Sequence, residues 1–198
     1  SMGMSPRWRG TSDTETVLAV IEAFGFESAL AKFIGMFAFA IWDAKRKKLF
    51  LARDRMGEKP LYYGQNGPIL VFSSELKALR AHPEFKPCIS REAVAMFLRY
   101  SCVPQPYSIY EGIRKLSPGH FVELATHANP ICYWSMREHV TRGVRSPLCV
   151  PKERAVSKLE NTLQDAVKKQ MQADVPLGAF LSGGVDTSLI LALMQAQS

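Results

Sequence analysis

Helical spacing of apolar residues marks the first structured stretch of the chain. Between Thr14 and Ile34, apolar side chains recur three or four positions apart, and Gly25 interrupts the pattern. We therefore expect two short helices with a break at Gly25. Ser12 or Asp13 can cap the first helix, because both residue types accept hydrogen bonds from the free N–H groups at a helix start.

Aromatic and β-branched residues dominate the next stretch, which is typical of strands. The apolar run 36–42 shows almost no polar alternation, so we expect a strand covered on both faces. The basic cluster 45–48 fits the solvated tip of a hairpin. A second hairpin is indicated by "GQNG", residues 64–67, between Tyr62 and the apolar segment 69–72. The pattern predicts a sheet of antiparallel strands.

Helical patterns return in the remainder of the chain. Four helices are expected, at 74–81, 90–100, 152–171 and 185–196. Ser90 is placed to cap the second of them. A short hairpin is expected to turn at 117–119, and a linker is expected between 140 and 151, where Gly, Pro and Arg occur without periodicity.

Composition narrows the class of protein without deciding a function. Of the 198 residues, 47% are hydrophobic, which suits one large or two small globular domains. The formal charge of +7 comes from basic residues that are spread out apart from 45–48, so we expect no nucleic-acid partner. The chain shows neither an apolar window of about 18 residues nor a signal-peptide stretch, so we expect a cytoplasmic protein without a membrane partner.

Four cysteines are present, at Cys88, Cys102, Cys132 and Cys149. Their wide spacing, with no Cys-x-x-Cys pair and no His at ligand spacing, argues against a zinc site and against a disulfide framework. We expect them to be buried thiols.

A glycine turn near the end of the chain carries candidate chemistry. The apolar run 177–181 is expected to be a strand that leads through "SGG", residues 182–184, into a helix, as at the start of a parallel α/β sheet. Backbone N–H groups and the helix dipole make such a junction an anion site, and the glycines leave room for phosphate. The alternative is an ordinary glycine-rich connection.

The order Ser-Gly-Gly-x-Asp-Thr-Ser resembles the pyrophosphate loop of the N-type ATP pyrophosphatases, which split ATP into AMP and pyrophosphate. The resemblance implies ATP and Mg²⁺ as cofactors, with Asp186 as the metal ligand. The residues that it implies for ATP or pyrophosphate are Leu181, Ser182, Gly183, Gly184, Asp186, Thr187 and Ser188.

Three segments resemble the class II glutamine amidotransferase domain of glutamine-hydrolysing asparagine synthetases. They are "GTSDTE" at 10–15, "GMFAFAIWDAKRKKLFLARDRMGEKPLYYG" at 35–64 and "FSSELKAL" at 72–79. The resemblance implies an incomplete Ntn-hydrolase-like αββα sandwich over residues 1–145, followed by the start of an ATP pyrophosphatase domain over 146–198. Asp13 stands where the family binds the α-amino group of glutamine, although the alternative of a plain helix cap is open.

The resemblance also implies that a catalytic residue is missing. Class II glutaminases use an N-terminal cysteine as the nucleophile. Here the first residue is Ser1 and the first cysteine is Cys88, so we assign no catalytic residue. We expect an internal piece of a longer protein, inactive by itself, whose uncovered sheet face forms a homodimer or lacks order.

For the longer protein, the resemblance implies an enzyme with glutamine and a carboxylate as substrates. Glutamine supplies ammonia, ATP activates the carboxylate, most simply that of aspartate, and asparagine, AMP and pyrophosphate result. Two alternatives stay open. The acceptor can be another carboxylate, such as a sugar acid in polysaccharide synthesis, or the chain can be a non-catalytic binding module.

Overall fold

The structure is a computed structural model that describes residues 8–124 and 129–197. The chain divides into two compact units, one up to Met136 (unit 1) and one from Arg137 onward (unit 2). Unit 1 contains the helices α1 (Asp13–Phe24), α2 (Phe26–Leu30), α3 (Leu76–Arg80) and α4 (Arg91–Tyr100). Its strands are β1 (Ala38–Asp43), β2 (Lys48–Arg53), β3 (Tyr62–Asn66), β4 (Ile69–Ser73), β5 (Ile113–Lys115), β6 (His120–Leu124) and β7 (Ile131–Cys132).

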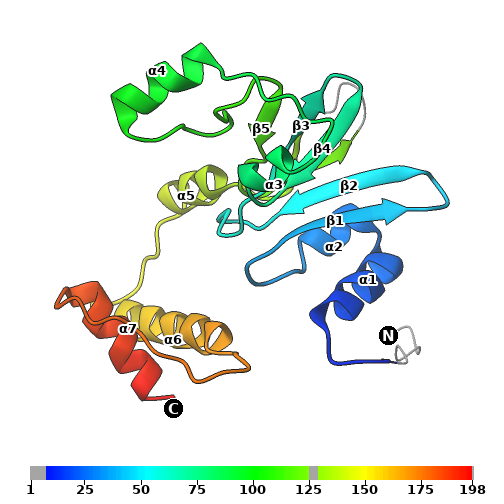
Figure 1. Cartoon of the computed structure of the whole chain (residues 1–198). Coiled ribbons are helices and arrows are strands. Elements are labelled where there is room, and N and C mark those ends of the chain that lie inside the picture. Colours follow the sequence, from blue (N-terminus) through cyan, green and yellow to red (C-terminus); the bar gives the residue numbers. More distant parts are fainter. Residues whose placement is uncertain (1–7, 125–128, 198) are drawn as a thin grey trace. The chain divides into compact units, whose positions relative to one another are not determined.

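Unit 1 is built on two antiparallel sheets, which confirms the predicted strand type. The first sheet has the order β1-β2-β6-β7 and the second has the order β4-β3-β5. In the first hairpin Ala40 lies opposite Leu51, and in the second Gly64 lies opposite Val71. Figure 1 shows α1 and α2 on one side of β1 and β2, with β3, β4 and β5 on the other side.

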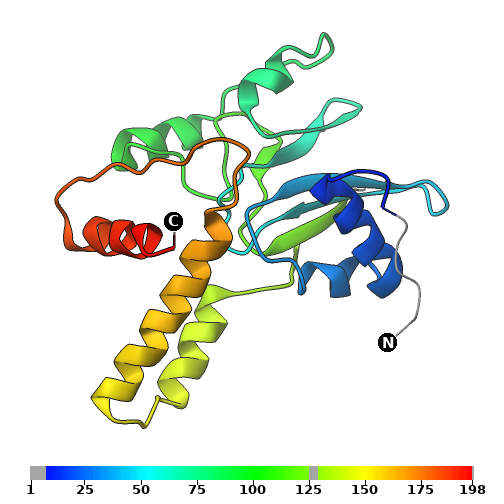
Figure 2. The ribbon, with the colours of Figure 1, turned by 90° about the horizontal axis from the view of Figure 1, so that it is seen from below.

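Three hydrophobic clusters connect these elements into layers. The first cluster joins the two sheets through Leu51, Leu61, Tyr63, Leu116 and Val122. The second lies on the outer face of the second sheet and includes Leu79 of α3. The third lies on the outer face of the first sheet, where Leu30 of α2 packs against Ala52 and Phe121. The layers therefore follow the order helix, sheet, sheet, helix, and Figure 2 shows α1 and α2 against the first sheet from a second direction.

Two serines cap helices as the sequence predicts. The Ser12 Oγ accepts a hydrogen bond from the Thr14 N–H at 3.2 Å, so Ser12 and not Asp13 is the cap of α1. The Ser90 Oγ accepts one from the Ala93 N–H at 3.2 Å at the start of α4. The break between α1 and α2 is also confirmed, because Gly25 has a φ of +78°, a conformation that glycine adopts at low cost.

The expected hairpin at 117–119 is wrong. The strands on its two sides, β5 and β6, belong to different sheets: β5 pairs with β3, and β6 pairs with β2 and β7. The turn therefore carries the chain from one sheet to the other. Local turn residues mark a change of direction but do not state which strands pair afterwards.

Coverage of β1 on both faces is also wrong. Trp42 is 58% exposed, and no residue of β1 is fully buried. β1 stands at the edge of its sheet, where it has only β2 as a neighbour in the described structure. An edge strand leaves side chains and backbone groups open on its free side.

The cysteines are not buried, contrary to the expectation from their spacing. All four, Cys88, Cys102, Cys132 and Cys149, are exposed and free. They lie outside the three hydrophobic clusters, in loops or in the short edge strand β7, so they fill no space in the core.

Unit 2 consists of helices with little shared core. α5 (Met136–Arg145) begins at the boundary and occupies the first part of the expected linker, and α6 (Lys152–Gln170) and α7 (Val185–Gln195) confirm two predicted helices. The expected strand at 177–181 is wrong, because this segment has neither helix nor strand. A strand needs a partner for its backbone groups, and no other strand lies among the described residues of unit 2. Within the described ranges, no helix has the length and apolar character that crossing a membrane requires.

Candidate functional site

A pocket in unit 1 brings together segments that are far apart in the sequence. Its volume is about 470 Å³, which suits a small molecule. Its lining residues are Asp13, Thr14, Val17, Leu18, Met36, Phe37, Ala38, Phe39, Ala40, Ile41, Lys59, Pro60 and Ser74. The first turns of α1, the β1 strand, the segment before β3 and the segment after β4 thus converge on one site.

The pocket follows the free edge of β1. Residues 37–41 line it in unbroken succession, although successive side chains of a strand point to opposite faces. The pocket therefore includes the outer edge of the strand and not a single face. Unpaired N–H and C=O groups at such an edge can bond to a polar ligand.

Asp13 lines this pocket with a carboxylate that no described residue binds. Ser12 provides the cap of α1, so the carboxylate of Asp13 is not needed for that role and makes no hydrogen bond or ion pair with the residues that the structure describes. Lys59 lines the same pocket and carries the opposite charge. A carboxylate and an ammonium in one small pocket complement a zwitterionic ligand such as an amino acid.

The segment that carries Lys59 is held by two buried charged residues, Arg53 and Asp54. The Arg53 guanidinium donates to the backbone C=O of Lys59 at 2.7 Å, of Gly57 at 2.6 Å and of Leu116 at 2.6 Å. Burial lowers the pKa of Arg53, and the negative charge of Asp54 opposes this shift. Hydrogen bonds from the buried Arg53 guanidinium therefore hold the loop after β2 in place.

Tyr133, which directly follows β7, supports the same loop. Its hydroxyl donates to the backbone C=O of Arg53 at 2.7 Å. Burial raises the pKa of the Tyr133 phenol far above its ordinary value, with a smaller contribution from the charge of Asp54. The neutral phenol is thus the form that the folded protein prefers.

The predicted phosphate loop lies in unit 2 and has the geometry of an open helix start. Gly183 has a φ of +79°, and Gly184 is the N-cap residue of α7 without a side-chain hydrogen bond to the helix. Ser182 and Thr187 share a hydrogen bond of 3.0 Å between their hydroxyls, and the Ser188 hydroxyl donates to the Gly184 C=O at 2.9 Å. Because no side chain caps the helix, the first N–H groups of α7 can donate hydrogen bonds to an anion.

Asp186 is the candidate metal ligand in this loop. It lies in the first turn of α7 and forms no hydrogen bond or ion pair with any described residue. The described part of the chain contains no group of three or more His, Cys, Asp or Glu residues that could hold a metal by themselves. One carboxylate still fits Mg²⁺ bound together with a nucleotide, because Mg²⁺ commonly takes one or two carboxylates and completes its shell with phosphates and water.

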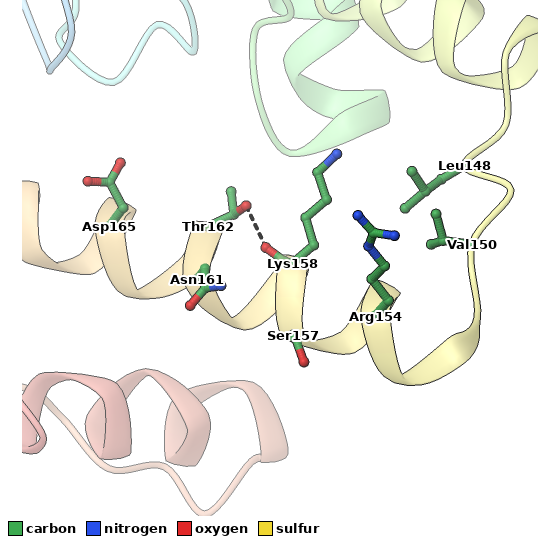
Figure 3. Close-up of a pocket in the computed structure, with 8 residues that line it drawn as sticks. All are labelled: Leu148, Val150, Arg154, Ser157, Lys158, Asn161, Thr162 and Asp165. Carbon is green, nitrogen blue, oxygen red and sulfur yellow. Dashed lines mark hydrogen bonds between the residues drawn. The ribbon is translucent and has the colours of Figure 1, made fainter.

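Unit 2 also contains a pocket, which lies away from the predicted phosphate loop. It measures about 760 Å³ and follows one side of α6 (Figure 3). Its lining residues are Leu148, Val150, Arg154, Ser157, Lys158, Asn161, Thr162 and Asp165. Figure 3 shows the Arg154 side chain extending toward Leu148 and Val150. None of the lining residues belongs to the predicted phosphate loop, so volume alone does not identify a functional site here.

Comparison with known proteins assigns the region that forms the unit 1 pocket. The family described as glutamine amidotransferase domain matches residues 3–134. The chain belongs to this family. A second family, described as asparagine synthase, matches residues 158–198. The pocket around Asp13 therefore lies within the amidotransferase match, and the loop 181–188 lies within the asparagine synthase match.

Three relatives illustrate the similarity. A putative asparagine synthetase [glutamine-hydrolyzing] 2 of Methanocaldococcus jannaschii is 36% identical over 189 residues, which cover 93% of this chain and 35% of the relative. Asparagine synthetase [glutamine-hydrolyzing] 3 of Bacillus subtilis is 36% identical, with 92% and 29% covered. Amidase chyE of Penicillium rubens is 31% identical, with 93% and 27% covered. The chain thus spans about a third of the length of these relatives or less.

The structure adds residues that sequence reasoning did not single out. Phe37, Lys59, Pro60 and Ser74 line the unit 1 pocket, whereas the sequence alone points only to Asp13. The signal was present, since these four residues lie within the segments 35–64 and 72–79 that resemble the family. Which positions in those segments face a common pocket follows only from the pairing and stacking of the sheets.

Proposed function

We propose that unit 1 binds glutamine in the pocket around Asp13. The observation that carries this proposal is the convergence of the three family-like segments on one pocket, where Asp13, Lys59 and Ser74 each contribute. The Asp13 carboxylate accepts hydrogen bonds from the α-ammonium group of glutamine, and Lys59 adds a positive charge for its carboxylate end. The free edge of β1 offers backbone groups to the side-chain amide.

We further propose that the full-length protein is a glutamine-dependent amidotransferase that makes asparagine from aspartate. The family matches and the names of the relatives from Methanocaldococcus jannaschii and Bacillus subtilis support this activity. The layer order of unit 1 supports an Ntn-hydrolase-like sandwich, and unit 2 is proposed as the start of an ATP pyrophosphatase domain. A cytoplasmic location and a homodimer remain predictions.

In unit 2, we propose that residues 181–188 bind the phosphates of ATP and that Asp186 contributes to Mg²⁺ binding. ATP supplies the activation of the acceptor carboxylate, with AMP and pyrophosphate as products. The open N–H groups of α7 and the hydroxyls of Thr187 and Ser188 stabilise negative charge on the phosphates. Gly183 and Gly184 permit the close approach of the backbone.

The glutamine site is tested by an Asp13→Asn substitution in the full-length protein. Loss of the carboxylate charge raises the KM for glutamine by about ten-fold or more, because a charge-assisted hydrogen bond becomes a neutral one. Glu22→Gln is the matched control, since Glu22 is an exposed carboxylate on the same helix and lies outside the pocket lining. An unchanged KM in Asp13→Asn would remove Asp13 from the proposed site.

The synthetase activity is tested by pyrophosphate release with MgATP and ammonium, with and without aspartate. Aspartate-dependent release is expected in the wild-type protein and is lost in Asp186→Ala, while Asp165→Ala on α6 serves as the control. Normal turnover of Asp186→Ala would show that this residue is not the metal ligand.

A second candidate is an amidotransferase with a different acceptor. One relative, from Penicillium rubens, is named an amidase and not an asparagine synthetase. The relatives of the chain therefore do not all carry the name of one enzyme. ATP binding without aspartate-dependent pyrophosphate release would favour another carboxylate, such as a sugar acid. Absence of any nucleotide affinity would favour a non-catalytic binding module.

A further inference from the structure

Asp54 is a buried carboxylate to which the proposed function assigns no role. It directly follows β2 and is 1% exposed. A buried carboxylate needs hydrogen bonds to replace its water shell. Its two oxygens accept four of them from backbone N–H groups: Oδ1 from Met56 at 3.1 Å and Glu58 at 3.0 Å, and Oδ2 from Phe37 at 3.3 Å and Lys59 at 3.0 Å.

Two of these four donors belong to the lining of the glutamine pocket. Phe37 directly precedes β1, and Lys59 lies in the loop between β2 and β3. Both donate to the same oxygen, Oδ2 of Asp54. A single buried atom therefore connects two parts of the pocket that are separated in the sequence by the whole β1–β2 hairpin.

The position of Lys59 is determined from both ends of the residue. Its N–H donates to Asp54, and its C=O accepts from the Arg53 guanidinium at 2.7 Å. The backbone of Asp54 adds to this arrangement, because its N–H donates to the Phe37 C=O at 2.9 Å. With both peptide groups held, the direction in which the Lys59 side chain leaves the backbone is restricted.

We propose that Asp54 is a positioning residue for glutamine, acting through Phe37 and Lys59 without touching the substrate. The proposal rests on the proposed function of the pocket. Asp54 holds the Lys59 backbone next to Phe37 at the start of β1, and hence fixes where the Lys59 side chain enters the pocket. A general contribution to folding would affect every activity of the protein, whereas positioning affects the glutamine site alone.

The experiment compares two nitrogen sources in the full-length protein. Asp54→Asn replaces one carboxylate oxygen by an NH₂ group, which cannot accept hydrogen bonds from N–H donors. We expect the KM for glutamine to rise by about ten-fold, while the rate with ammonium stays at the wild-type value because ammonium does not need the pocket. Asp43→Asn is the matched control: Asp43 accepts bonds from the N–H groups of Lys45 and Arg46 in an exposed turn of the same sheet and lies outside the pocket.

Four results would overturn the inference. Asp54→Asn could leave the KM for glutamine unchanged, or it could lower the glutamine and ammonium rates by the same factor, as a purely structural residue would. If Asp54→Asn does not fold, Asp54→Glu takes its place, because glutamate keeps both acceptor oxygens but moves them by one methylene group relative to the Phe37 and Lys59 N–H groups; an unchanged KM there also contradicts the proposal. A wild-type protein that uses only ammonium would instead refute the proposed glutamine site itself, and the inference with it.

Discussion

The two units differ in how much hydrophobic core supports their candidate sites. In unit 1 three hydrophobic clusters connect two sheets and the helices on their outer faces, and the pocket is assembled from four separate segments. In unit 2 the buried hydrophobic residues are Val167 and Leu193. Phe180, directly before the predicted phosphate loop, is 98% exposed, and Val185 within that loop is 85% exposed.

The difference separates two ways of making a site. The predicted phosphate loop uses consecutive residues, so its glycines, hydroxyls and helix start come together through local geometry. The pocket around Asp13 requires β1, the loop after β2 and the end of β4 to meet, which depends on the packing of the sheets. Disturbing the core should therefore damage the pocket and leave the loop nearly unchanged.

The largest effect is expected from a core substitution in unit 1. Leu51→Ala removes a side chain that is 0% exposed between the two sheets, so unfolding of unit 1 should become easier by about 2–5 kcal/mol. Leu159→Ala on α6, where Leu159 is 59% exposed, should change stability by less than about 1 kcal/mol. Urea denaturation of both variants checks this, and equal losses would show that the contrast in burial has no energetic counterpart.

A smaller effect is expected from Tyr133→Phe, which deletes the hydroxyl that donates to the Arg53 C=O. The loss should be about 1–2 kcal/mol near neutral pH. Because the folded-state pKa of Tyr133 is raised, its stabilising contribution is complete below the ordinary tyrosine pKa of 10.0 and falls as the pH rises above that value. The stability difference between wild type and Tyr133→Phe should therefore shrink above pH 10, as denaturation curves at several pH values will show. A difference that does not change with pH would contradict the assigned cause.

The smallest effect compares the two helix starts. Ser12→Ala removes the side-chain cap of α1 and should lower stability by about 1 kcal/mol. Ser188→Ala removes a hydroxyl that bonds only to the Gly184 C=O one turn earlier in α7, so stability should change by less than about 0.5 kcal/mol. Thermal melts without nucleotide distinguish the two. A larger loss in Ser188→Ala would mean that this hydroxyl is structural and not free for phosphate.

Much of the secondary structure could be predicted from local signals. The break at Gly25, the caps at Ser12 and Ser90 and the hairpin around 64–67 depend on neighbouring residues, and all are confirmed. The expected strand at 177–181 failed because an apolar run becomes a strand only where another strand can pair with it. The prediction of buried cysteines was wrong because residue type and spacing carry little information on position relative to a core.

For the site, the sequence indicated the segments but not their meeting point. Asp13 was assigned through the family resemblance, while the helix-cap alternative was decided by the Ser12 hydrogen bond to Thr14. Lys59 and Ser74 could not be placed in the same pocket in advance. Asp54 and Arg55 both follow β2, and nothing local distinguishes the buried carboxylate of Asp54 from the partly exposed Arg55 beside it.

By itself, the sequence determined features that depend on a few consecutive residues: the helix caps at Ser12 and Ser90, the break at Gly25 and the hairpin around 64–67. Tertiary structure alone decided that β5 and β6 join different sheets, that β1 is an edge strand and that Asp54 connects Phe37 to Lys59. The physical reason is the separation along the chain between the groups that interact. Caps and turns satisfy backbone groups within a few residues, whereas sheet pairing and burial join groups whose separation along the chain places no limit on their contact.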